Sequence, residues 1–222
     1  MLKKIPLVAL CFVSLAHAHS LYPDLKTATY PLRDHEIDTT TFPNRTLLRF
    51  SNGVANVGRG RLEIKAGSLN SDGTRKVYQR IFSTHGGYSS RLAGSFVYHP
   101  QHGHTHFGDF AKYKLRRITS TGGVGSIIAS SDKVSFCLID EDVYNSSLTY
   151  YRPYRRYLFC NTTVQGISVG WVDVYNKTLP DQWIDVTNIE AGQYWLESTA
   201  DPSNRLVESN ESNNTTRIKV DI

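Results

Sequence analysis

Short runs of alternating or β-branched residues recur along almost the whole chain, and turn-forming residues separate them. Examples are "RLEIKAG" (61–67), "FAKYKLRRI" (110–118) and "GQYWLEST" (192–199), with turns such as "SDG" and "TGG" between such runs. Side chains alternate between the two faces of a strand, whereas an amphipathic helix requires a period of 3.6 residues. No sustained stripe of the longer period occurs in the sequence. We therefore predict an all-β fold, a single irregular β-sandwich-like domain with long loops and little helix.

The expected strands and the expected N-terminal arm cover most of the chain. Residues 19–45 carry three prolines and no alternating run, so we expect an irregular arm that wraps the core. No low-complexity linker divides the rest, which favours one domain over residues 19–222. We expect strands at 46–52, 61–67, 76–82, 95–99, 110–118, 124–130, 133–139, 155–160, 168–175, 182–188, 192–199 and 216–222.

The first 18 residues have the pattern of an export signal. Lys3 and Lys4 precede the apolar run "IPLVALCFVSLA", and the small residues Ala16 and Ala18 follow it. The run is shorter than the roughly 20 residues that a membrane-spanning helix needs. The sequence therefore predicts a signal peptide over 1–18, a secreted extracellular protein, and no membrane partner.

Cysteine content and glycan acceptors agree with export. Cys11 would leave with the signal, so Cys137 and Cys160 remain as a pair available for one disulfide; two buried free thiols are the alternative. Several N-x-S/T triplets also fit a secreted glycoprotein. They begin at Asn44, Asn145, Asn161, Asn176, Asn210, Asn213 and Asn214.

The net charge is mildly positive. It is +5 for the whole chain, and loss of Lys3 and Lys4 with the signal would reduce it. The sequence contains no repeated Lys/Arg stripe, which argues against a nucleic-acid partner. The segment "RPYRR" (152–156) fits either contact with an anionic partner or an ordinary solvated loop.

Histidines are concentrated in "YHPQHGHTHFGD" (98–109), where His102, His104 and His106 alternate. If this stretch is extended, all three imidazoles point to one face, and Gly103 permits the bend that brings them together. Three neutral imidazoles form a ligand set for Cu²⁺ or Zn²⁺. Spacing alone leaves the choice of metal open, and a solvent-facing or pH-sensitive histidine patch is the alternative without metal. His99 fits a supporting role rather than a ligand.

The same segment, "HPQHGHTHFGDF", resembles the copper-binding stretch of lysyl oxidases. Other segments are similar to that family's catalytic domain and occur in the family's order: "LLRFSNGVANVG" (47–58), "KVSFCLIDED" (133–142) and residues 165–214, which hold "D-x-Y", "QWIDVT" and "NN". The resemblance covers residues 47–214 in patches. Gln101, Trp171 and Asp181 stand where animal members have cysteines, and Lys112 where they have a histidine.

The resemblance implies a catalytic role for two residues that otherwise look ordinary. Members of the family build lysine tyrosylquinone from one lysine and one tyrosine, and the matching positions here are Lys133 and Tyr175. Without the resemblance, Lys133 would be a solvated lysine at the start of a strand and Tyr175 a half-buried aromatic. The implied ligands of Cu²⁺ are His102, His104 and His106.

The implied reaction is oxidation of a primary amine, a protein lysine side chain or a small amine, by molecular oxygen. The products are an aldehyde, ammonia and hydrogen peroxide, with the quinone acting as electron sink. Asp173 and Asp109 are candidates for the general base, although either fits a structural acceptor. The tail Glu208–Asn214 resembles a calcium-binding end of the domain, and a polar turn is the alternative.

Two other functions fit parts of the sequence. Cleavage after Ala18 would expose His19, and an N-terminal histidine chelates copper in lytic polysaccharide monooxygenases. The tail "DPSNRLVESNESNN" (201–214) also resembles the closing strand of Ig-like adhesion repeats, which would make the chain a non-enzymatic wall or matrix module. Replacement of His19 separates the first alternative from an amine oxidase, because only the monooxygenase needs that residue.

Overall fold

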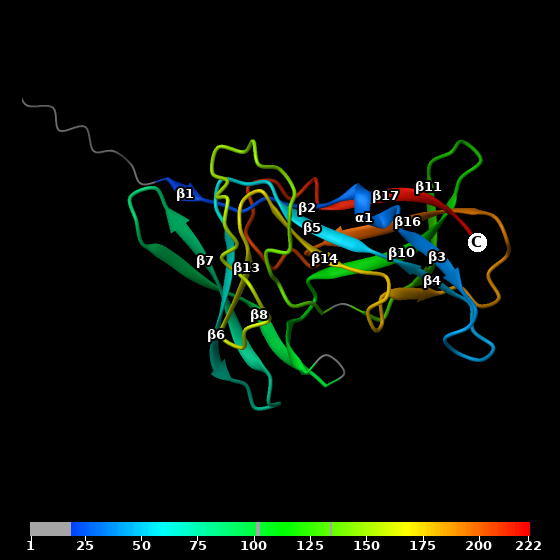
Figure 1. Ribbon diagram of the computed structural model, residues 1–222, viewed down its shortest axis with the longest axis horizontal. Helices are drawn as coiled ribbons and strands as arrows, with labels where there is room; N and C mark the ends of the chain where they lie inside the picture. The colour runs from blue at the N-terminus through cyan, green and yellow to red at the C-terminus, as the bar shows by residue number, and fades with distance from the viewer. Residues whose placement is uncertain (1–18, 101–102, 134) are drawn as a thin grey trace, which may run out of the picture.

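A computed structural model describes residues 19–100, 103–133 and 135–222 of the chain. Within these residues the only helix is the single turn α1 (Thr29–Leu32), and the remaining elements are strands in several sheets (Figure 1). The expectation of an irregular all-β domain with little helix is confirmed. None of the described residues belongs to a helix long and apolar enough to cross a membrane.

The largest sheet has six strands and lies at one end of the molecule in Figure 1. Its order is β13-β6-β7-β8-β9, and β1 is added along β7. The bounds are β1 (Ser20–Leu21), β6 (Leu62–Leu69), β7 (Arg75–Ser83), β8 (Tyr88–His99), β9 (His104–Phe107) and β13 (Val164–Ile167).

Three smaller sheets form the other end and enclose most of the core. The first is β11-β10-β16-β17, the second β12-β14-β5-β2 and the third β15-β4-β3. Their bounds are β2 (Leu25–Thr27), β3 (His35–Asp38), β4 (Leu47–Phe50), β5 (Asn52–Asn56), β10 (Ala111–Ile118), β11 (Val124–Ser130), β12 (Asp142–Val143), β14 (Trp171–Tyr175), β15 (Trp183–Asp185), β16 (Gln193–Ala200) and β17 (Thr215–Asp221).

The alternation in the sequence explains why these segments are strands. In β10, Ala111, Tyr113 and Leu115 are fully buried, while the residues between them are exposed or half-buried. The strands β4 and β5 are buried at every position, because elements cover both of their faces. Continuous burial of this kind yields an apolar or small-residue run rather than an alternating one.

Residues 19–45 are more regular than the sequence indicates. They contain the helix α1 and the strands β1, β2 and β3, and these strands pair with β7, β5 and β4 in turn. Leu25 and Leu32 are fully buried, so this segment contributes to the core as well as covering it.

The predictions of strands at 133–139 and 155–160 are wrong. Among the described residues of the first segment only Phe136 makes a bridge, to Phe107, and residues 155–160, all described, hold no strand. Side-chain acceptors take backbone N–H groups that a neighbouring strand would otherwise bind. The Tyr175 hydroxyl accepts from Cys137 N at 2.6 Å, Gln165 Oε1 from Leu138 N at 3.1 Å, and Asp140 Oδ2 from Arg156 N and Tyr157 N.

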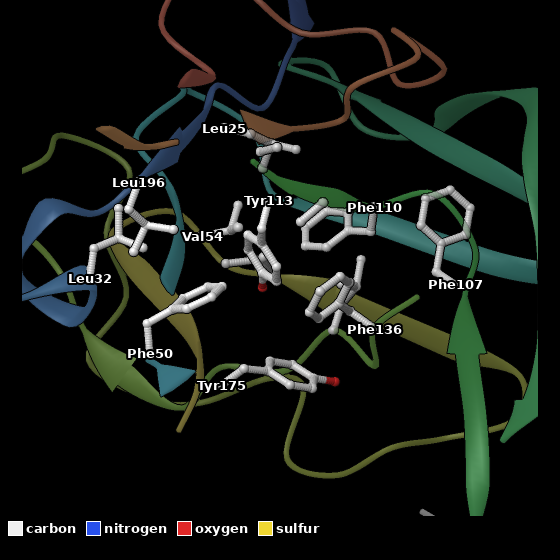
Figure 2. Packing of buried hydrophobic residues seen from close by; sticks show 14 of the residues in the cluster. Leu25, Leu32, Phe50, Val54, Phe107, Phe110, Tyr113, Phe136, Tyr175 and Leu196 are labelled. Carbon is white, nitrogen blue, oxygen red and sulfur yellow. The ribbon is translucent and has the colours of Figure 1, made fainter. Parts of the chain in front are cut away.

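An aromatic cluster fills the core between the sheets (Figure 2). Tyr113 and Phe136 are buried, and their rings meet edge to face with centroids 6.0 Å apart. Phe136 packs in the same manner on Tyr175, with centroids 4.8 Å apart. Tyr175 therefore lies at the edge of the core, between the packed interior and the segment that carries Lys133.

Candidate active site

The end of β8 and the strand β9 bring three histidines together. His99 pairs with His104 across the hairpin, and Val97 pairs with His106. Gly103 turns the chain between the strands with φ of 68°, which confirms the expected bend. The expectation that His104 and His106 share an extended strand is also confirmed, whereas His102 lies outside the described residues.

The imidazoles of His104 and His106 face each other closely. Their Nε2 atoms are 2.9 Å apart, and His106 Nδ1 lies 3.3 Å from the Ser135 hydroxyl. The ring of His99 stacks on that of His106, with centroids 4.8 Å apart. His106 is fully buried, so its ring orientation is fixed by these neighbours. Two nitrogens at this separation form either a hydrogen bond or two corners of one coordination sphere.

The disulfide Cys137–Cys160 forms, as expected from the cysteine content. Its sulfurs lie within 4.8 Å of a ring nitrogen of His104. Because both cysteines are oxidised, they offer no thiolate to a metal. The bridge instead joins the segment of Cys137 to that of Cys160, beside the histidine strand.

Lys133 is buried beside this histidine cluster. Its backbone N–H donates to Ser131 Oγ at 3.1 Å, and Phe136 bonds to Phe107 of β9 through both of its backbone groups. The Lys133 side chain is 6% exposed, and its Nζ makes no hydrogen bond within the described part of the chain. Burial lowers the pKa of Lys133 to about 8, with the nearby Asp181 carboxylate opposing that shift.

The ammonium of Lys133 lies over the ring of Tyr175. Nζ is 5.2 Å from the Tyr175 centroid and also 5.2 Å from that of Phe136. An interaction with the two aromatic faces partly replaces the lost hydration of the ammonium. Residues 42 positions apart in the sequence are thus neighbours without any further movement of the backbone.

Tyr175 is held at its hydroxyl by one residue. The hydroxyl accepts from Cys137 N at 2.6 Å and donates to Cys137 O at 3.0 Å. Burial raises the pKa of Tyr175 well above its usual value, and the Asp173 carboxylate adds to the shift. The phenol is therefore neutral at physiological pH in this environment. Asn176, the next residue, is exposed, so a glycan there would project away from the buried ring.

Asp173 lies on the same face of β14 as Tyr175 and is buried. Its Oδ1 has no hydrogen-bond partner among the described residues. Burial raises the pKa of Asp173 well above the usual range, and Glu141 contributes in the same direction. A raised proton affinity of this kind is typical of carboxyl groups that act as general acids or bases in closed sites.

Asp109, the other candidate base, lies in a different environment. Its Oδ2 faces Arg205 Nε at 3.5 Å, and its backbone adopts φ of 60° in the turn after β9. Neither Asp109 nor Asp173 is among the described residues that line the pocket at Lys133. The structure therefore brings Asp173 to Tyr175 and leaves Asp109 facing the segment after β16.

A pocket of about 390 Å³ opens onto Lys133. Its walls include His99 and Ser135 from the histidine cluster, and the carboxylates of Asp132, Asp181 and Asp185. Asp185 is paired with Arg45 Nε at 2.9 Å, whereas Asp181 Oδ2 lies 4.0 Å from His99 Nε2.

Sequence reasoning did not select Asp181 as a site residue. The available signal was its position, where animal members of the resembled family have a cysteine, just before "QWIDVT".

A second cluster of acidic side chains, here called the second acidic group, lies between β16 and β17 and consists of Asp201, Glu208 and Glu211. Carboxylate oxygens of Asp201, Glu208 and Glu211 lie within 4.8 Å of one another. Glu208 is buried, which raises its pKa to about 8 although Leu25 N and Asn214 Nδ2 donate to it. The side-chain oxygens of Asn213 and Asn214 are buried and accept no hydrogen bond within the described part of the chain. Oxygen ligands of this kind suit a hard cation such as Ca²⁺.

Comparison with known proteins identifies the family of this chain. The family model "Lysyl oxidase" matches residues 87–222. The chain belongs to the lysyl oxidase family.

Its similar relatives include lysyl oxidase homolog 3B of Danio rerio, 32% identical over 78% of this chain, and protein-lysine 6-oxidase of Gallus gallus, 32% identical over 84%. Protein-lysine 6-oxidase of Sus scrofa is 36% identical over 59% of the chain. The chain spans 17%, 36% and 49% of these relatives' lengths.

His19, the histidine of the alternative copper-enzyme hypothesis, lies outside β9 and belongs to no strand. The backbone N of His19 donates to Thr84 Oγ1 at 3.2 Å, and His85 Nδ1 lies 3.1 Å from the same oxygen. His19 and His85 are both exposed and lie beside the turn between β7 and β8.

Proposed function

We propose that this chain is a secreted, copper-dependent amine oxidase that oxidatively deaminates primary amines, peptidyl lysine among them. The products would be an aldehyde, ammonia and hydrogen peroxide, with molecular oxygen as the second substrate. One observation carries the proposal: Lys133 Nζ lies 5.2 Å from the centre of the Tyr175 ring, in a pocket that it shares with His99.

The histidine cluster fits Cu²⁺. Two nitrogens about 2.0–2.1 Å from one metal are roughly 2.9–3.4 Å apart when the angle between them is right or tetrahedral. The Nε2 atoms of His104 and His106 are 2.9 Å apart. We propose His102, His104 and His106 as the ligands, with Ser135 orienting His106 through its other ring nitrogen. When bound, copper supplies one-electron oxidation at this edge of the core.

Lys133 and Tyr175 are the proposed precursors of lysine tyrosylquinone. A pKa of about 8 leaves part of the Lys133 population as free amine at neutral pH, and only the free amine has a lone pair to form a bond with the ring. The hydrogen bonds between the phenol and the backbone of Cys137 hold the ring in one place beneath that nitrogen. The quinone, once formed, supplies an electron sink for amine oxidation.

The remaining walls of the pocket fit a cationic substrate. Asp181 and Asp132 present carboxylates toward the space in front of Lys133, which favours entry of a primary ammonium. Asp173 is the proposed general base, because it is buried beside Tyr175 and its pKa is raised. Asp109 stays a weaker candidate, since its carboxylate faces Arg205.

The proposal is tested by peptide mass spectrometry on copper-loaded protein, together with a peroxide assay on simple amines. We expect a cross-linked peptide that joins the segments of Lys133 and Tyr175. His106→Ala should lose both bound copper and the cross-link, whereas His85→Ala, on an exposed turn, should keep both. Separate unmodified peptides in protein with a full copper content would reject the oxidase and favour a non-catalytic matrix module. Loss of activity in His19→Ala would favour the monooxygenase.

We also propose that the second acidic group binds Ca²⁺ and stabilises the domain. Without a cation, the raised pKa of Glu208 means that the folded state holds a proton which the unfolded state releases, so stability falls as pH rises from 4.5 to about 8. Calcium should offset this loss, adding about 2.7 kcal/mol at a free concentration 100 times its dissociation constant.

Thermal unfolding at pH 5 and pH 7.5, with calcium or with chelator, measures this effect. The calcium-dependent rise in Tm should be larger at pH 7.5 and should disappear in Glu208→Gln, while Glu190→Gln, an exposed control, behaves as wild type. An equal rise in Tm in both variants would show that calcium acts elsewhere.

The proposal includes export to an oxidising compartment, which the disulfide supports. Residues 1–18, the expected signal peptide, lie outside the described residues. We propose residues 19–222 as the lysyl oxidase-like catalytic domain.

A further inference from the structure

A basic pocket lies apart from the candidate active site. It occupies about 180 Å³ where β1 and the turn between β5 and β6 meet the long loop between β12 and β13. None of its lining residues also lines the pocket at Lys133. Arg152, Tyr154 and Arg156 of the "RPYRR" segment line it, and the sequence left two possible roles open for that segment.

Four arginines line this pocket, and no carboxylate is among its described lining residues. Arg59 and Arg61 come from the turn before β6, and Arg152 and Arg156 from the long loop. Convergence of like charges from two distant segments costs free energy unless an anion offsets their repulsion.

Internal partners neutralise only one of the four guanidinium groups within the described part of the chain. Arg61 pairs with Glu63 at 3.3 Å, and its guanidinium lies over the Phe82 ring. Arg59 donates to the neutral hydroxyl of Tyr150 at 2.9 Å, and Arg152 to a backbone oxygen. The Arg156 side chain makes no hydrogen bond or ion pair there, and its contact with Asp140 is made by the backbone N–H alone.

We propose that this pocket binds a sulfate ester of an anionic polysaccharide. A planar carboxylate is satisfied by one bidentate arginine, whereas a tetrahedral oxyanion presents oxygens to guanidinium groups from several directions. The volume is below the roughly 300–1,000 Å³ of pockets that enclose whole drug-sized ligands, so it suits a single group on a larger molecule.

The rim of the pocket supports a polysaccharide as the carrier of that group. The Tyr154 side chain is 55% exposed beside the arginines, and its ring offers a flat apolar face to a sugar ring. Leu158 and Phe159 follow on the same loop and are also exposed, next to a second pocket that shares Arg156. The proposal stands independently of the amine oxidase assignment, because it uses none of that site's residues.

The test measures binding of the full chain to heparin, by calorimetry at fixed ionic strength. Arg152→Ala/Arg156→Ala should weaken binding about tenfold or more, since a charge-assisted contact is worth roughly that factor. The control Arg33→Ala/Arg117→Ala removes the same charge from exposed sites elsewhere and should weaken binding only about twofold. Tyr154→Ala should weaken heparin binding without changing competition by inorganic sulfate.

Three results would overturn the proposal. Equal losses in the two double variants would indicate attraction to a basic protein in general. Binding of desulfated heparin as tight as that of heparin would exclude the sulfate ester. Tighter binding of polyglutamate, lost in the pocket variant, would assign the pocket to an acidic peptide. Circular dichroism of each variant checks that the fold is intact, and Arg152→Gln/Arg156→Gln repeats the test with longer polar side chains.

Discussion

Tyr175→Phe is expected to abolish amine oxidation, by at least about a thousandfold, while leaving the copper content unchanged. The phenol oxygen is the atom that the proposed quinone requires. Among the described residues, the Lys133 ammonium lies over the rings of Tyr175 and Phe136, and Phe136 has no hydroxyl group. The variant should also lose about 1–2 kcal/mol of stability, because Cys137 N and O lose their shared partner. Peroxide release, copper analysis and denaturant unfolding measure the three effects.

Tyr157→Phe is the matched control for that experiment. Tyr157 is also buried, and its hydroxyl donates to Glu63 at 2.8 Å, outside the pocket at Lys133. It should lose a comparable amount of stability and keep its activity. An active Tyr175→Phe variant would show that the activity does not depend on a quinone built from Tyr175.

Lys133→Met is expected to abolish activity and, at the same time, to stabilise the fold by about 2–3 kcal/mol at pH 7. The pKa of Lys133 falls from 10.5 to about 8 on folding, so below pH 8 the folded protein keeps a buried ammonium that it would be more stable without. The penalty is fully present below pH 8 and disappears as pH rises from 8 toward 10.5, because the folded lysine then releases its proton first. The gain should shrink over that range.

Urea unfolding of copper-free, uncross-linked protein at pH 7 and pH 10 measures this gain. Lys112→Met removes an exposed lysine from β10 and should change stability by no more than about 0.5 kcal/mol at either pH. A Lys133→Met variant no more stable than wild type at pH 7 would mean that water or an anion solvates the ammonium in solution. Residues at functional sites commonly lower stability in this way.

Local sequence patterns predicted most strands because each strand needs only an alternating or continuously apolar face. They failed where the chain bonds to side chains instead of to a neighbouring strand. "KVSFCLI" has strand-like residues, yet three of its backbone N–H groups donate to side chains instead of to a neighbouring strand. The acceptors are the side-chain oxygens of Ser131, Tyr175 and Gln165, which follow no regular spacing in the sequence. No periodicity in a single sequence encodes such partners.

In the candidate site as well, local geometry was predictable from the sequence and tertiary contacts were not. The alternation of His104 and His106 predicted their common face, because strand geometry alone determines it. The position of Lys133 over Tyr175 depends on the bridge between Phe136 and Phe107 and on packing of the aromatic core. Only the family resemblance selected these two residues. Asp181 was not selected, since its role depends on where a turn with φ of 62° places it.

The disulfide lies between the two halves of the proposed chemistry. One of its cysteines holds the phenol of Tyr175 through its backbone, and both sulfurs lie close to His104. A chain still in a reducing environment would therefore lack the brace that aligns phenol and imidazole. Under the proposed function, hydrogen peroxide would form only in a compartment where the disulfide can form.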